Sequence, residues 1–168
     1  MPEKETIKRA RGDEAEGKSP STQAGEFVRE EMHHIREGKH GAANTKQAIA
    51  IGLSKARRAG VRLAAPNRRT TSTETRKKAQ QDLRKARAGR GRPSPRRSRA
   101  TLGALKREPH RAASRENLSK QARTAARRRG PRARHESAEE AVSTKGADRL
   151  REAGKKAART RARNRKAA

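Results

Sequence analysis

Large apolar side chains are scarce in this chain. Phe27 is its one phenylalanine, tyrosine and tryptophan are absent, and Leu, Ile, Val and Phe together number 15 of 168 residues. Folding domains usually contain at least ~20% of these four types. Because so little apolar surface can be buried, we expect most of the chain to form no packed core. A dry pocket is equally unexpected, so the composition argues against an enzyme, a cofactor or a small-molecule substrate.

Cysteine is absent, which excludes disulfide scaffolds and the zinc modules that need cysteine ligands. The longest uncharged apolar stretch, residues 48–53, is far shorter than the ~20 residues of a membrane span. The first residues, including Glu3 and Glu5, are acidic and polar and do not resemble a secretory signal. We therefore expect a cytoplasmic protein with no membrane partner.

The charges are strongly unbalanced along the chain. There are 47 Lys+Arg against 18 Asp+Glu, a net charge of +29, and residues 61–168 carry +26 of it. Large apolar residues concentrate instead between Phe27 and Leu63. This distribution predicts a disordered N-terminal segment (1–20), a helical hairpin domain (21–63), and an Arg/Ala-rich basic tail with transient helices (64–168).

Apolar spacing within residues 21–63 predicts two amphipathic helices. The first helix should begin at Ser21 or Thr22 and end at Gly38, and the second should run from Asn44 to Gly60. Their apolar stripes consist of Ala24, Phe27, Val28, Met32 and Ile35, and of Ile49, Leu53 and Ala56. The expected fold class is mainly α, a small hairpin head followed by a largely disordered, helix-prone tail. We expect so small a head to self-associate or bind another protein.

Several tail segments have good helix propensity without a wide apolar stripe. A capping-box pattern at Thr71 and Glu74 predicts a helix ending near Gly89, and residues 112–129 and the segment opening at Ser137 are further candidates. Like charges repel at i,i+4 in such segments, so we expect them to fray until a polyanion binds. Residues 89–95 should form an extended linker.

Histidine and glutamate residues cluster near the end of the first predicted helix. They are Glu30, Glu31, His33, His34, Glu37 and His40. A metal site needs ligands that converge from several elements, and these residues fall on one side of one helix. We interpret them as an exposed charged face with i,i+4 contacts and expect no metal site. Catalytic triads and phosphate-binding glycine patterns are likewise not apparent.

The basic tail is the main indication of function. A net charge of +26 over 108 residues would attract nucleic acid through counterion release. Arginine outnumbers lysine 32 to 15, which favours forked phosphate contacts. Without aromatic platforms for unpaired bases, double-stranded DNA is the expected partner. The candidate phosphate-binding residues are Arg96, Arg97, Arg127, Arg128, Arg129, Arg132, Arg134, Lys155, Lys156, Arg159, Arg161, Arg163 and Arg165.

These observations predict a non-specific DNA-binding accessory protein of the nucleoid. One alternative is an RNA-associated or ribosome-associated basic protein. A second is an adaptor whose head docks a protein partner while the tail serves as a tether. Codon bias in a GC-rich genome would explain the abundance of Arg and Ala, although it would not explain the shortage of Asp and Glu.

Parts of the head and tail resemble known proteins. Residues 21–31, 37–41 and 45–60 resemble a family of small basic bacterial proteins classed as a domain of unknown function, most specifically in the Lys-Gln-Ala-Ile-Ala-Ile-Gly-Leu-Ser sequence at 46–54. This resemblance implies a bacterial source and transfers no activity. The tail is similar to those of bacterial histone-like proteins, although richer in arginine. Ser94-Pro95-Arg96-Arg97 resembles turns of linker-histone and sperm-histone tails that are associated with the minor groove of AT-rich DNA.

Overall fold

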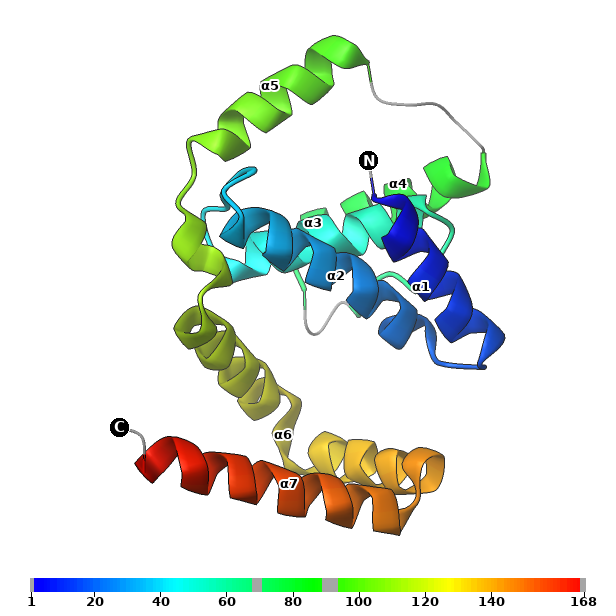
Figure 1. The fold of residues 1–168 in the computed structure, drawn as a ribbon. Coiled ribbons are helices and arrows are strands. Elements are labelled where there is room, and N and C mark those ends of the chain that lie inside the picture. The colour runs from blue at the N-terminus through cyan, green and yellow to red at the C-terminus, as the bar shows by residue number, and fades with distance from the viewer. Residues whose placement is uncertain (1, 68–70, 89–93, 167–168) are drawn as a thin grey trace. The chain divides into compact units, whose positions relative to one another are not determined.

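A computed structural model of the chain describes residues 2–67, 71–88 and 94–166 (Figure 1). Within these ranges the chain is helical and contains no strand, so the mainly α class is confirmed. No helix of the described part combines the length and apolar character needed to cross a membrane. The elements are α1 (Lys4–Ala15), α2 (Pro20–Arg36), α3 (Thr45–Arg58), α4 (Thr73–Arg87), α5 (Pro95–Lys106), the 3-10 helix η1 (His110–Ala113), α6 (Arg115–Lys145) and α7 (Ala147–Lys166). Contacts divide the chain into two units, residues 1–121 and 122–168.

Helices α2 and α3 begin at side-chain caps. Ser19 Oγ accepts a hydrogen bond from the Thr22 backbone N–H over 3.4 Å, two residues before the earliest cap expected from the sequence. Asn44 Oδ1 accepts a hydrogen bond from the Gln47 backbone N–H over 2.9 Å. Asn44 is the N-cap residue that the sequence predicted for α3. The short connection between the two helices lets them pack against each other.

Small side chains set the close packing of this first unit. A Cβ atom at Gly52 of α3 would lie 2.7 Å from Val28 Cα of α2, so the two backbones approach too closely for any larger residue. The core of this unit consists of two clusters of buried apolar residues, and alanine predominates in both. One cluster is Met32, Ile35, Ala42, Ala48, Ala112 and Ala113, and the other is Ala10, Ala24, Phe27, Ala56 and Val61. The shortage of large apolar residues is thus met by close approach of the helices.

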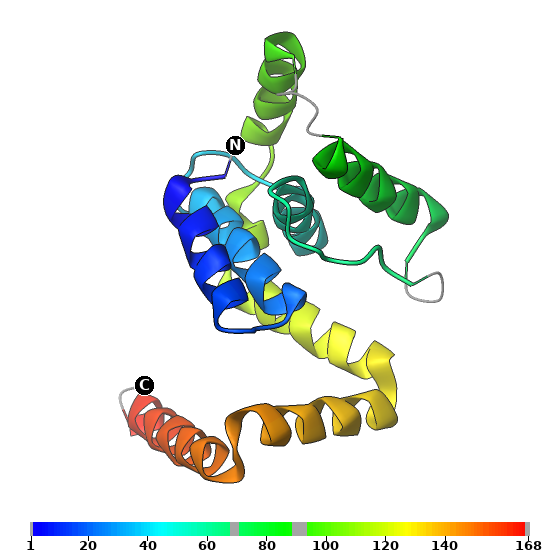
Figure 2. The same ribbon diagram turned by 90° about the vertical axis from the view of Figure 1, so that its right-hand side faces the viewer.

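The N-terminal segment 1–20, expected to be disordered, contains helix α1 packed against α2 (Figures 1 and 2). Thr6 and Ala10 are buried in this contact, and Arg9 Nε lies 2.6 Å from Glu26 Oε2. Threonine and alanine give no strong apolar periodicity, which is why the sequence pattern did not indicate this helix.

The expectation of a largely disordered tail is wrong for the described residues, which form α4 to α7. Alanine, arginine and lysine have high intrinsic helix propensity, and i,i+4 ion pairs add to it. Lys78 Nζ lies 2.7 Å from Glu74 Oε1, and its hydrogen bond holds the pKa of that carboxyl below the usual range. Local helix propensity and ion pairs therefore outweigh the repulsion between like charges in these helices.

Part of the predicted tail belongs to the core of the first unit. Ala112 and Ala113 of η1 are buried against α2 and α3. Helix α4 packs against α3, where Ser54 Oγ donates a hydrogen bond to Asp82 Oδ2 over 2.6 Å and Ala79 is buried. The packed unit accordingly extends well beyond residue 63.

The second unit consists of helix without a packed interior, since no residue between 122 and 165 is buried. The chain turns at Gly130 (φ 78°), which is followed by Pro131, and again at Gly146 (φ 78°). The candidate helix predicted over residues 112–129 therefore ends at the first of these turns. Ser137 caps no helix, because its Oγ donates to the Ala133 carbonyl over 2.8 Å within α6. Most of the predicted extended linker, residues 89–93, lies outside the described residues.

Candidate functional site

The predicted phosphate-binding side chains are all exposed. Two lie in the first turn of α5, five on α6 and six on α7. The α5 pair is Arg96 and Arg97; the α6 group is Arg127, Arg128, Arg129, Arg132 and Arg134; the α7 group is Lys155, Lys156, Arg159, Arg161, Arg163 and Arg165. The structure thus places these cations on ordered helices, where the sequence predicted a disordered tail.

Few of these cations are neutralised by residues that the structure describes. Arg132 Nε lies 3.1 Å from Glu136 Oε1, and Arg134 Nε donates to the Gly130 carbonyl over 3.1 Å. The other eleven candidates form no ion pair with any described residue. Their ammonium and guanidinium groups are therefore available to an external anion.

Helix α7 arranges its cations in rows. Lys155, Arg159 and Arg163 recur every four residues, so they lie on one face with a rise of about 6 Å between successive side chains. Arg161 and Arg165 form a second row by the same spacing. A polyanion lying along this helix would meet a positive charge at each turn.

The Ser94-Pro95-Arg96-Arg97 motif starts α5. Ser94 Oγ accepts a hydrogen bond from the Arg97 N–H over 3.3 Å, and Pro95 occupies the first turn. The sequence motif resembles a turn of histone tails, whereas in this structure it forms the N-terminus of a helix. Arg96 and Arg97 extend from it into solvent.

The first unit contains a feature that the sequence interpretation missed, a buried charged cluster between α2 and α3. Glu30 is 4% exposed and Glu31 is fully buried, so the prediction of an exposed charged face is wrong for both. Lys55 of α3 lies 2.7 Å from Glu31 Oε2 and 3.3 Å from Glu30 Oε1 through its Nζ atom. Neither oxygen of Glu31 accepts a hydrogen bond within the described residues. Lys55 Nζ and Glu31 Oε2 therefore form an ion pair at 2.7 Å whose geometry is not that of a hydrogen bond.

Two histidines complete this cluster. His40, in the loop after α2, is 7% exposed, so the prediction of an exposed charged face is wrong for it too, and its Nε2 lies 3.4 Å from Glu31 Oε1. His34 Nε2 lies 2.8 Å from Oε1 of Glu3, just ahead of α1. Hydrogen bonds from His34 and Lys39 hold the pKa of the Glu3 carboxyl below its usual range. His33 and Glu37 are exposed, as expected.

The register of α2 held a signal for this cluster. Glu31 stands four residues after Phe27 and four before Ile35, so an acidic side chain occupies a position on the apolar stripe. A carboxylate at such a position must be buried with a partner. That partner is Lys55 of α3. The periodicity of α2 alone does not identify it, because Lys55 lies on another helix.

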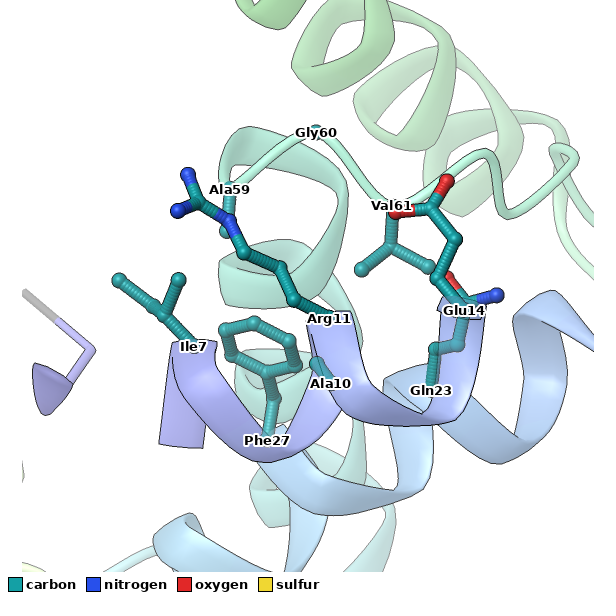
Figure 3. A pocket seen from close by; sticks show the side chains of 9 residues that line it. All are labelled: Ile7, Ala10, Arg11, Glu14, Gln23, Phe27, Ala59, Gly60 and Val61. Carbon is teal, nitrogen blue, oxygen red and sulfur yellow. The ribbon is translucent and has the colours of Figure 1, made fainter. Parts of the chain in front are cut away.

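A small pocket lies beside α1 (Figure 3). Its volume is about 80 Å³, below the ~300 Å³ of a typical ligand site. Phe27, Ile7 and Val61 provide apolar surface, and Arg11 and Glu14 come from α1 (Figure 3). The pocket borders part of the Phe27 cluster and is too small for a typical ligand.

Comparison of the chain with protein-family models, with curated proteins and with solved structures found no match. The assignment of function therefore depends on the residues and geometry described above.

Proposed function

We propose that this protein binds double-stranded DNA without sequence specificity and acts as an accessory protein of the nucleoid. The observation that carries this proposal is the uncompensated charge of residues 122–168, which contain 16 Lys+Arg and 5 Asp+Glu. All their candidate phosphate-binding side chains are exposed, and most form no ion pair with a described residue. This surface binds DNA by neutralising its phosphates, and the binding involves no catalytic step.

Counterion release supplies the binding free energy in this mechanism. Each Lys or Arg that neutralises a phosphate displaces a condensed cation from the DNA, which favours association at low salt. Arginine adds a planar fork that can donate two hydrogen bonds to one phosphate. Contacts of this kind position the protein on the duplex without reading its sequence.

The choice between DNA and RNA is tested by competition. Duplex DNA should bind at least as tightly as single-stranded RNA of equal length at the same salt, because the chain has no Tyr or Trp and its one Phe, Phe27, is buried. Fluorescence anisotropy with a labelled duplex and unlabelled competitors measures the ratio. A clear preference for structured RNA would replace this proposal with the ribosome-associated alternative.

The α5 arginines test for a minor-groove contribution. Arg96→Lys with Arg97→Lys keeps the charge and removes the guanidinium fork, so the salt dependence of binding should stay the same. Arginine enters the narrow minor groove of A-tracts more favourably than lysine. If these residues do so, the double variant should lose preference for A-tract over mixed duplex. An unaltered preference in the competition assay would show that the motif contributes charge alone.

A further inference from the structure

The buried cluster of α2 and α3 has an excess of negative charge. Glu30 and Glu31 both face the single ammonium group of Lys55. Glu30 also accepts a hydrogen bond from the Glu3 backbone N–H over 3.1 Å, whereas Glu31 accepts none within the described residues. A fully buried carboxylate without hydrogen bonds is costly unless a further cation lies beside it.

The hydrogen bond of His40 determines which of its ring nitrogens faces Glu31. Nδ1 lies 3.1 Å from the Gly41 carbonyl oxygen, and because a carbonyl only accepts, Nδ1 must carry a proton. In the neutral ring Nε2 then presents a lone pair to Glu31 Oε1, 3.4 Å away. Two lone pairs at this distance require a cation between them or a proton on one of the two groups.

His34 has a similar arrangement. Its Nε2 lies 2.8 Å from Glu3 Oε1, and because a carboxylate accepts, Nε2 is the donor. The neutral ring therefore keeps its lone pair on Nδ1. In many metal sites, a histidine donates a hydrogen bond from one ring nitrogen to a carboxylate and binds the metal through the other ring nitrogen. Glu3 and His34 have this arrangement.

We propose that Glu31, His34 and His40 form a binding site for a divalent transition metal ion of the zinc class. One potential ligand atom from each residue lies within 4.8 Å of the other two. The 3.4 Å between His40 Nε2 and Glu31 Oε1 matches the edge of a tetrahedron with bonds of about 2.0–2.1 Å. Lys55 contacts Oε2 and leaves Oε1 toward His40.

The ligand chemistry selects the class of metal. Two imidazoles and one carboxylate are a ligand set typical of zinc, with at least one position left for water. Magnesium and calcium prefer oxygen ligands throughout and should bind poorly here. Because the ligands come from α2 and from the loop that follows it, a bound ion would hold this loop against the helix.

The test uses the full-length protein without a histidine tag, freed of metal with EDTA and then desalted. Titration with cobalt(II) should produce the visible absorption of a low-coordinate site and saturate at one ion per chain. Zinc should displace the cobalt, and magnesium should not. These measurements on the unaltered chain need no variant to fold.

Variants identify the ligands. His40→Gln and Glu31→Gln should each weaken cobalt binding at least ~10-fold, since each removes a direct ligand. His33→Gln is the matched control, because His33 is exposed on the same helix and should leave binding unchanged. Circular dichroism of each variant shows whether the helices are retained.

Two results would overturn the site. One is the absence of saturable cobalt binding by the unaltered chain, which would mean that no metal ion lies between His40 and Glu31. The other is an equal loss in His33→Gln and His40→Gln. Neither result bears on DNA binding, which involves other residues.

Discussion

Replacing Arg127, Arg128 and Arg129 with alanine is expected to weaken binding to duplex DNA by about 10²–10³ at ~0.1 M salt. The three side chains are consecutive, exposed and free of ion pairs with described residues. Each phosphate contact contributes about 0.9 to the slope of log K against log salt. Loss of three contacts should therefore make the slope shallower by about 3, whatever the DNA sequence. Anisotropy titrations at several salt concentrations measure both quantities.

Two controls separate local contacts from net charge. The triple variant with lysine at the same positions keeps the charge and should keep the slope. Alanine at Lys8, Lys46 and Arg62 removes three exposed charges from the first unit, and should change the slope by less than about 1. If these substitutions in the first unit weaken binding as much as the first set, then overall charge explains the attraction and α6 has no special role.

The largest loss of stability is expected from Phe27→Ala, at about 3–5 kcal/mol. Phe27 is 1% exposed and is the largest side chain of its cluster. Its buried neighbours Ala10, Ala24 and Ala56 are too small to fill the cavity, and the backbones they connect are already close. Urea unfolding followed by the NMR signals of the Ile35 methyl groups, in the neighbouring cluster, measures the change.

Leu102→Ala is the matched control for this prediction. Leu102 lies on α5 and is 43% exposed, so its truncation should cost less than about 1 kcal/mol. Equal losses from the two variants would mean that the Phe27 cluster does not hold the first unit together.

The sequence predicted the part of the fold that depends on large apolar residues. The periodicity of Val28, Met32 and Ile35 located α2, and Asn44 located the start of α3. Helix α1 and η1 were missed because they pack through Thr6, Ala10, Ala112 and Ala113, whose small side chains leave little trace in a hydropathy pattern.

The charged residues were predictable to different degrees. The exposure of the arginines follows from composition alone, since so many cations cannot be buried. The burial of Glu31 could be suspected from its place on the apolar stripe, but its contacts could not. His40 reaches it through a turn at Gly38 (φ 74°), and Lys55 reaches it from α3. Tertiary geometry of this kind has no signature in local spacing.

The salt dependence of duplex DNA binding by the unaltered protein tests the proposed function most directly. With ~8–10 phosphate contacts, log K should fall against log salt with a slope of about −7 to −9. This slope counts the neutralised phosphates and needs no knowledge of a biological target. A slope near zero would contradict counterion-release binding, and with it the function proposed for this protein.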